Sequence, residues 1–166
     1  MTKNLYSNEA IDKLKSLIDG NKIAIFCTEL TKLPIQSRPM AVQEVDDEGN
    51  LWFISSENSN KNCEIKKDDD VQLFFSNSAN SQFLSFYGHA TIYTDPEKIE
   101  EIWNPVAKAW FEDGKEDQDI SVIKVSPKDV YYWDTKDGKI ISIFKMAGAA
   151  FLGTKTDVGV VGKLNF

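Results

Sequence analysis

Residues 37–55 read SRPMAVQEVDDEGNLWFIS, and this stretch decides the fold. Two runs of strand-forming residues, 40–45 and 51–55, flank a short polar segment that contains Gly49. Strand-forming runs on either side of a glycine turn are typical of a β-hairpin. The stretch therefore predicts two neighbouring antiparallel strands in a β-sheet.

Arg38, at the outer end of this hairpin, is the only arginine among 19 basic residues. If the two strands pair outward from the turn, antiparallel counting places Arg38 opposite Asn58, close to Ser59 and Lys61. Ser59 is also a suitable N-cap for a short helix, whose first amides would face the same corner. A guanidinium, an ammonium and a hydroxyl group would then converge. This combination predicts a binding site for a phosphate group.

The remainder of the chain alternates short β-type runs with turns and a few helical segments. Residues 83–93 alternate strictly, with small and apolar side chains on one face, as expected for a strand that lines a barrel. Ser7 is a suitable N-cap for an amphipathic helix, and Asp95 followed by Pro96 is a typical helix start. Other strands are predicted at residues 22–28, 71–75, 120–125, 130–133 and 140–144.

This order of segments predicts a mainly β fold, an antiparallel barrel of six to seven strands with peripheral helices. No repeat or low-complexity linker divides the sequence, so residues 1–166 are expected to form a single domain. A parallel nucleotide-binding sheet is not expected, because strands do not alternate with helices and no glycine-rich first turn is visible.

Composition argues against several classes of function. Acidic residues outnumber basic ones by 26 to 19 and the lysines are scattered, so nucleic acid is not an expected partner. No apolar run approaches the roughly 20 residues of a membrane span, and Cys27 and Cys63 lie in unrelated contexts. A cytoplasmic protein with free thiols is expected. Because His89 is the only histidine, no metal site or Ser-His triad is expected, and residues 68–70, three aspartates, are interpreted as a helix terminator.

Several motifs, taken in order and spacing, resemble the pyridoxamine-phosphate-oxidase-like FMN-binding split barrels, especially their bacterial general stress protein branch. The resemblance covers most of the chain. One of its motifs is Trp103-x-Pro105, on a helix predicted in the second half of the sequence. The other motifs that carry it are Ser37-Arg38-Pro39-Met40, Gly49-Asn50-Leu51-Trp52-Phe53, Ser55-x-x-x-Ser59-x-Lys61, Gly88-His89-Ala90, Asp95-Pro96, Val125-Ser126-Pro127 and Tyr132-Trp133-Asp134.

The resemblance implies a homodimer with two FMN sites at the subunit interface. Arg38 and Lys61 match phosphate-binding positions of the family, and Ser59 lies at the neighbouring hydroxyl position. Trp133 matches an aromatic residue that reaches the flavin from the partner chain. The remaining cofactor-binding residues implied by the resemblance are Pro39, Met40 and Ala41 on the strand beside the flavin, Ile54 and Ser55 on the next strand, and Gln82 just before a later strand.

The chain departs from the true oxidases after Trp133. Those enzymes carry a basic and histidine-bearing stretch that holds pyridoxal phosphate, whereas Lys139, Ile141 and Ile143 stand at the corresponding places here. The resemblance therefore implies FMN binding and flavin redox chemistry with a small reductant, such as a nicotinamide, but not the vitamin-oxidase reaction. No catalytic residue is identified.

Four alternatives stay open at this point. Arg38 is also explained by a surface ion pair with Glu57 or Glu64. The flavin could be held without turnover, in a non-catalytic or stress-sensing module, or the barrel could carry another ligand such as haem, for which His89 is the one candidate axial ligand. The aromatic residues Trp103, Trp110 and Phe111 either line a ligand cleft or bury against the sheet.

Overall fold

The computed structural model describes residues 1–111, 113–135 and 159–166. The strand predicted at residues 140–144 lies outside the described residues, as do Lys139, Ile141 and Ile143. Most of the tail after Met146 lies outside them as well, and its last residues form a strand.

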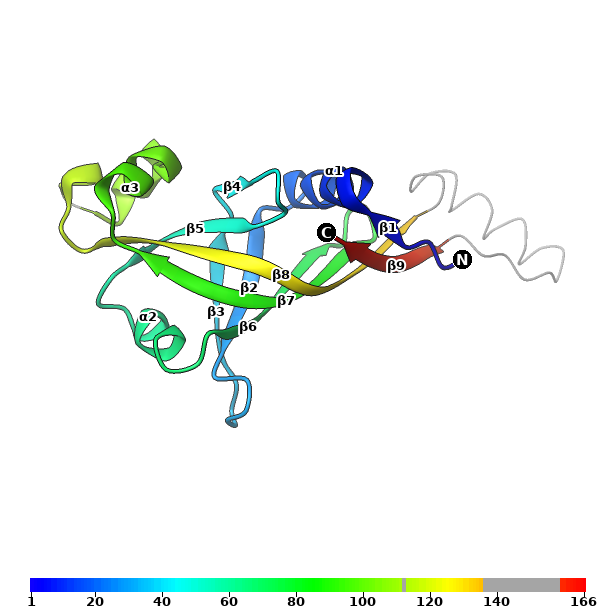
Figure 1. Cartoon of the computed structure of the whole chain (residues 1–166), viewed down its shortest axis with the longest axis horizontal. Helices are drawn as coiled ribbons and strands as arrows, with labels where there is room; N and C mark the ends of the chain where they lie inside the picture. Colours follow the sequence, from blue (N-terminus) through cyan, green and yellow to red (C-terminus); the bar gives the residue numbers. More distant parts are fainter. Residues whose placement is uncertain (112, 136–158) are drawn as a thin grey trace, which may run out of the picture.

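The fold is mainly β, as predicted, with helices at the periphery of a twisted sheet (Figure 1). The described strands are β1 (Leu5–Tyr6), β2 (Ile23–Thr28), β3 (Gln36–Ala41), β4 (Glu44–Val45), β5 (Leu51–Ser56), β6 (Asp70–Asn77), β7 (Gln82–Tyr93), β8 (Ile120–Thr135) and β9 (Gly159–Asn165). The helices are α1 (Ser7–Asp19), α2 (Asn60–Ile65) and α3 (Pro96–Ile102), with short 3-10 helices η1 (Pro105–Ala109) and η2 (Gly114–Glu116).

Seven strands form the barrel, and two of them, β3 and β4, follow each other in the chain and share one place in the ring. Strand β2 pairs with β6, β6 with β7, β7 with β8 and β8 with β5, all antiparallel. The ring is completed by β3 and β4, because β3 pairs with β2 and the short β4 pairs with β5. The parallel pair β1 and β9 extends the sheet from β8, so the whole sheet is mixed.

The hairpin that was predicted from residues 37–55 is only partly correct. Val45 pairs with Leu51 as expected, but the pairing ends after one more residue. The strand breaks at residues 42–43, and the segment before the break turns to pair with β2. Arg38 therefore lies opposite Phe26, and the predicted pairing with Asn58 is wrong.

Strand β8 is longer than predicted, since residues 120–125 and 130–133 belong to one continuous strand. Its register against β7 shifts between Tyr87 and Gly88, which is a β-bulge. At the bulge the two backbones approach closely, and a Cβ atom on Gly88 would lie 2.1 Å from the carbonyl oxygen of Ser126. The bulge explains how a segment with a proline can remain within the strand.

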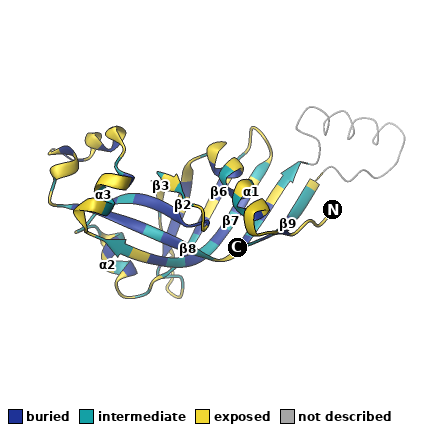
Figure 2. Ribbon diagram, turned by 45° about the horizontal axis from the view of Figure 1, so that its top comes forward, coloured by how far each residue is buried: buried dark blue, intermediate teal, exposed yellow. Residues whose placement is uncertain are grey.

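The barrel interior is filled by alternate side chains of its strands. The buried residues are coloured dark blue on the ribbon in Figure 2. Leu84, Phe86 and Ala90 of β7 face inward, as the alternation of residues 83–93 predicts. Phe26 and Phe53 meet edge to face with ring centroids 5.4 Å apart. Burial of these aromatic and aliphatic groups supplies the main driving force for closing the barrel.

The helices lie around the barrel, and α3 packs on the outer face of β5 and β8 through Trp52, Ile54 and Val122. The predicted cap of α1 is wrong, because Ser7 is the first helical residue and Tyr6 is the N-cap. Helix α3 starts as predicted, with Asp95 accepting hydrogen bonds from the amides of Glu97 and Lys98. Among the residues that the structure describes, no helix is both long and apolar enough to cross a membrane.

The aromatic residues of the helical insert divide between a small core and the surface. Phe111 is buried and its ring lies 6.3 Å from that of Trp103. Trp110 is 76% exposed. The burial of Phe111 favours packing against the sheet as its role, whereas Trp110 is available to a ligand or to solvent.

Candidate functional site

Arg38 lies at one end of the barrel, between β2 and α2, and its guanidinium group is held by two partners. Nη1 donates to Oγ1 of Thr28 at 2.6 Å, and Nη2 donates to Oε2 of Glu64 at 2.8 Å. The Thr28 hydroxyl in turn donates to the same Glu64 oxygen at 2.5 Å. The side chains of Arg38 and Glu64 are 22% and 13% exposed, and Thr28 is fully buried. The ion pair with Glu64, given above as the alternative explanation of Arg38, is therefore present, but it is mostly buried and not a surface pair.

The Arg38–Glu64 pair determines the charge state of the carboxyl group. Burial alone would raise the pKa of Glu64. Hydrogen bonds from Thr28 and Arg38, together with the positive charge of Arg38, outweigh burial and lower this pKa below its usual range. Glu64 is thus ionised at neutral pH, and Arg38 is paired with a full negative charge.

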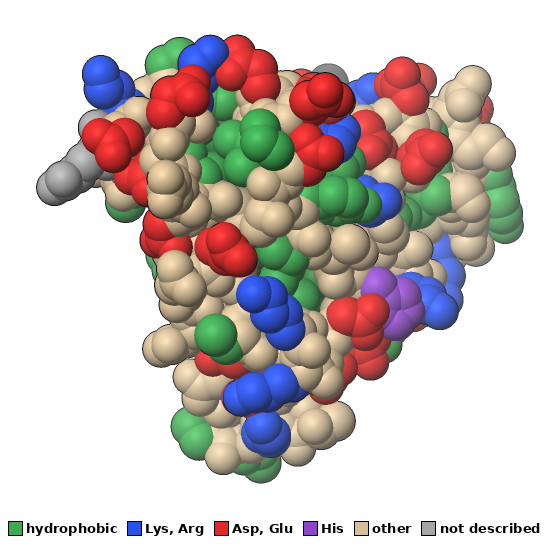
Figure 3. All heavy atoms as spheres, turned by 60° about the vertical axis from the view of Figure 1, so that its left-hand side comes forward, with side chains coloured by type: hydrophobic (Ala, Val, Ile, Leu, Met, Phe, Trp, Pro, Cys, Tyr) green, Lys and Arg blue, Asp and Glu red, His purple; other side chains and the backbone are tan. Residues whose placement is uncertain are grey.

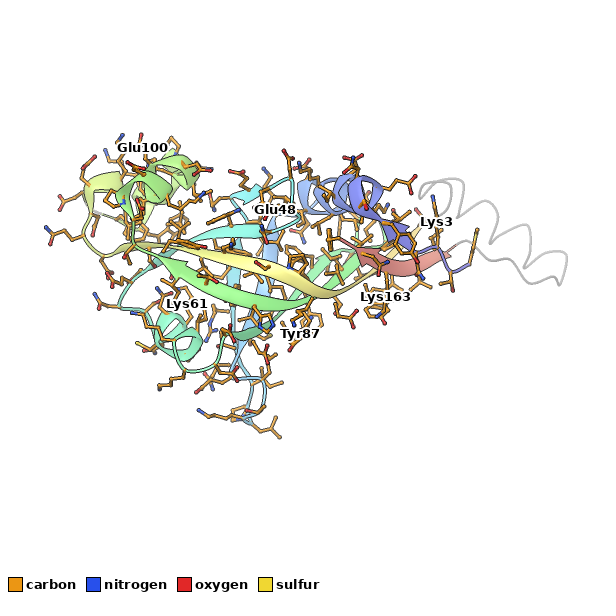
Figure 4. The ribbon with its side chains drawn as sticks, in the orientation of Figure 1. Lys3, Glu48, Lys61, Tyr87, Glu100 and Lys163 are labelled. Atoms are coloured by element: carbon orange, nitrogen blue, oxygen red, sulfur yellow. The ribbon has the colours of Figure 1, made fainter. Side chains whose placement is uncertain are left out.

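Lys61 is the second cation of this corner and projects from the first turn of α2 (Figure 4). Burial lowers the pKa of Lys61, and the charge of Arg38 lowers it further, while Asp119 and Glu64 act in the opposite direction. Within the described part of the chain Lys61 forms no ion pair. Arg38 is thus ion-paired, whereas Lys61 interacts with Asp119 and Glu64 only at longer range, and a partly buried cation without an ion pair favours an added anion.

Helix α2 is fixed to the barrel by a buried polar network. Ser59 caps the helix as predicted, accepting a hydrogen bond from the amide of Asn62. The Asn62 side chain accepts from Ser55 Oγ at 2.8 Å and donates to Ser121 Oγ at 2.8 Å. Ser55, Asn62 and Ser121 are all buried, so these bonds are protected from water. The network links α2 to β5 and β8 and thereby holds Lys61 in place.

Asp119 fixes the loop that leads into α2. Its carboxylate accepts hydrogen bonds from the Ser56 hydroxyl, and from the amide and side chain of Asn58 at 3.1 and 2.8 Å. The Ser56 and Asn58 bonds lower the pKa of Asp119. Sequence reasoning missed Thr28 and Asp119, because each reaches this corner from a distant part of the chain. It also missed Asn62, which directly follows Lys61, because its role depends on Ser121 of another strand.

The residues predicted on the strand beside the flavin occupy an edge of the sheet. Over its described residues β3 pairs only with β2, so the backbone groups on its other side are open to a ligand. Pro39 and Ala41 are exposed on the face opposite Arg38, whereas Met40 packs against the core. On β5 the Ile54 side chain packs toward the helical insert, so the backbone of β5 is the part that would meet a ligand.

Gln82 and Trp133 lie away from the Arg38 corner. Arg38 on β3 is joined to β7 through successive paired residues on β2 and β6, and the residue reached on β7 is Phe86. Gln82 instead lies at the β6–β7 turn. Trp133 pairs with Phe83 on the neighbouring strand. The predicted cofactor residues of one chain thus form two separate groups, one around Arg38 and one at the other end of β7 and β8.

His89 is engaged with aspartates on the outer surface. Its Nδ1 atom lies 3.0 Å from Asp70 and 3.7 Å from Asp69, and the three possible ligand atoms lie within 4.8 Å of one another. The side chains of His89 and Asp70 are 39% and 38% exposed, and the histidine is visible beside acidic groups in Figure 3. Nδ1 of His89 and Oδ1 of Asp70 are buried atoms without a hydrogen-bond partner among the described residues, and this contact between β6 and β7 lies outside the Arg38 corner.

The model of the family described as pyridoxamine 5'-phosphate oxidase like matches residues 9–157. The chain belongs to the pyridoxamine 5'-phosphate oxidase-like family. The match spans the barrel, α2 and the helical insert, and therefore includes every predicted cofactor-binding position. Protein bli-3 of Neurospora crassa is 30% identical over 135 residues, and the match covers 75% of this chain and 65% of that relative. The chain therefore spans less than two thirds of this curated relative.

Solved structures of similar proteins share the fold. A structure assigned to general stress protein 26 of Jannaschia sp. CCS1 has a TM-score of 0.74 and 20% identity, covering 96% of this chain and 99% of that one. The general stress FMN/FAD binding protein of Xanthomonas citri has a TM-score of 0.66 and 24% identity, covering 76% of this chain and 89% of that one. These likenesses confirm the predicted split-barrel fold of the family.

Proposed function

We propose that this protein binds FMN through its phosphate group at the Arg38 corner and acts as a flavin-dependent oxidoreductase. The observation that carries the proposal is the convergence of Arg38 and Lys61 from β3 and α2, with no ion pair between Lys61 and a described carboxylate. The family membership and the flavin-binding neighbour from Xanthomonas citri support the choice of flavin.

Each group in the corner has a distinct task in this proposal. Arg38 offers a planar set of donors, and Lys61 offers a point charge to the same phosphate. The open edge of β3 presents backbone groups to the polar edge of the ring. When bound, the isoalloxazine ring supplies the redox chemistry, and the protein supplies binding and orientation. Because Arg38 is the only arginine, we propose no second phosphorylated substrate and no pyridoxamine phosphate oxidation.

A flavin titration tests the proposal. We expect purified protein to bind FMN at one equivalent per chain, seen as a shifted visible flavin spectrum. Steady-state oxidation of a reduced nicotinamide by the loaded protein would then separate an oxidoreductase from a flavin-binding module without turnover. Absence of any saturable FMN binding, at concentrations up to the solubility of the flavin, would exclude the proposal.

We also propose that the protein is a homodimer whose subunits meet through an exposed face of the sheet. This outer apolar face spans β2, β6, β7 and β8, and its large apolar side chains are between 41% and 49% exposed. Isolated proteins seldom leave such a continuous apolar area in water. Pro39 and Ala41 extend the face to the open edge of β3. The residues that define the face are Ile23, Ile25, Phe74, Phe83 and Trp133.

The predicted cofactor residues of one chain lie in two separate groups, so a single chain does not bring them together. This separation favours a second copy of the chain as the partner that binds to the outer apolar face. Trp133 belongs both to the face and to the distant group. If two copies meet through this face, the Trp133 of one chain can approach the β3 edge of the other. The same contact would then bury the apolar face and complete the flavin site.

Phe74→Glu is expected to weaken dimerisation at least about tenfold, because a charge would be buried at the centre of the interface. Light scattering coupled to size-exclusion chromatography, over a concentration series, measures the change. Val106→Glu is the matched control, because Val106 is exposed on η1, away from the outer apolar face. A wild-type protein that stays monomeric at tens of micromolar, or equal effects of both substitutions, would contradict the proposed interface.

A further inference from the structure

We propose that Glu64 limits the affinity of the Arg38 corner for phosphate by acting as an internal counter-ion. The inference rests on the proposed FMN site and names the residue that sets its affinity. Glu64 would occupy Arg38 in the free protein and repel the phosphate of the incoming flavin. Weak, exchangeable FMN binding would follow, instead of permanent retention of the cofactor.

The first argument is that each terminal nitrogen of the guanidinium group already donates one hydrogen bond within the protein. Glu64 accepts from Nη2 of Arg38, and Thr28 accepts from Nη1. Because Thr28 also donates to Glu64, the three side chains form a closed set of hydrogen bonds. A phosphate that enters must either displace the carboxylate or share the guanidinium group with it.

The second argument is a charge count for the corner. Arg38 and Lys61 carry two positive charges, and Glu64 carries one negative charge. Lys67, which acts on Glu64, and Asp119, which acts on Lys61, add one charge of each sign and cancel in the count. A phosphate monoester carries about 1.5 to 2 negative charges at pH 7, so the two cations alone would nearly balance it. With Glu64 ionised, the loaded corner has an excess of negative charge. Arg38 and Glu64 are mostly buried, so water and salt screen this repulsion only weakly.

Glu64→Gln isolates the charge from the geometry. Glutamine has nearly the same size, and its carbonyl oxygen can still accept the hydrogen bonds from Arg38 and Thr28. Glu64→Ala is the second variant, since it removes the charge even if the amide does not reproduce those bonds. The matched control is Glu9→Gln, because Glu9 is exposed on α1, far from the corner. This substitution changes the net charge of the protein by the same amount as Glu64→Gln.

The experiment titrates each protein with FMN and with riboflavin, which lacks the phosphate, and follows flavin fluorescence. For Glu64→Gln we expect the dissociation constant for FMN to fall at least about tenfold, while that for riboflavin changes less than about twofold. Glu64→Ala should change FMN binding in the same direction. Glu9→Gln should match the wild-type protein with both ligands.

The outcomes separate this inference from the proposed function. If the wild-type protein binds FMN through Arg38 and both Glu64 variants bind it equally well or more weakly, the inference is overturned. Weaker binding by the variants would mean that Glu64 holds the guanidinium group in place for the phosphate. A tighter affinity for riboflavin as well would also overturn it, because the effect would not act through phosphate. Failure of the wild-type protein and of both Glu64 variants to bind FMN would overturn the proposed function and this inference together.

Discussion

Replacing Arg38 with alanine is expected to weaken FMN binding by about 100-fold, while riboflavin binding stays within about twofold of the wild-type value. Hydrogen bonds from a charged donor to a phosphate oxygen are among the strongest that a protein side chain makes. Removal of Arg38 also leaves Glu64 ionised without its partner, next to the position of the phosphate. Loss of attraction and added repulsion therefore act in the same direction, and flavin titration measures their sum.

A second substitution separates these two contributions. In Arg38→Ala combined with Glu64→Ala, the unpaired carboxylate is gone, and we expect part of the lost FMN affinity to return. Lys66→Ala serves as the charge control, because Lys66 is exposed at the end of α2 and forms no ion pair within the described part of the chain. Wild-type affinity for FMN in Arg38→Ala would show that the phosphate does not bind at this corner.

Much of the local structure could be predicted from the sequence, because short-range chemistry decides it. Ser59 caps α2 and Asp95 caps α3, since each side-chain oxygen accepts a hydrogen bond from an amide two or three residues ahead. The alternation of residues 83–93 likewise fixes which side chains of β7 face the core. Ser7 was misassigned because its backbone has a φ of 48°, and Tyr6 occupies the cap position instead.

The candidate site was predicted less well, because it depends on contacts between distant segments. Arg38 and Lys61 do lie at one corner, but α2 brings them together and the hairpin does not. The break at residues 42–43 carries no glycine or proline, so no local signal marks it. Thr28 and Asp119 come from β2 and from the loop before β8, and periodicity cannot reveal which strands will be neighbours.

Gly88→Ala is expected to destabilise the fold by about 3 kcal/mol, which lowers the melting temperature of a chain of this size by about 6–12 °C. The added Cβ atom would lie 2.1 Å from the carbonyl oxygen of Ser126, well inside any tolerated contact. The neighbouring atom belongs to the backbone, so no side-chain rotation can relieve the clash. Strand β8 would have to move away from β7 at the bulge, and thermal unfolding followed by circular dichroism measures the cost.

Gly159→Ala provides the matched control, because its nearest neighbour, the carbonyl oxygen of Asp134, lies 4.0 Å from the added Cβ atom. We expect this variant to melt within about 2 °C of the wild-type protein. Equal stability of Gly88→Ala and Gly159→Ala would mean that the bulge adapts at little cost. A selective loss in Gly88→Ala would instead show that β7 and β8 must stay in close contact there. Those two strands carry both Gln82 and Trp133, so the same bulge would then also support the second group of predicted cofactor residues.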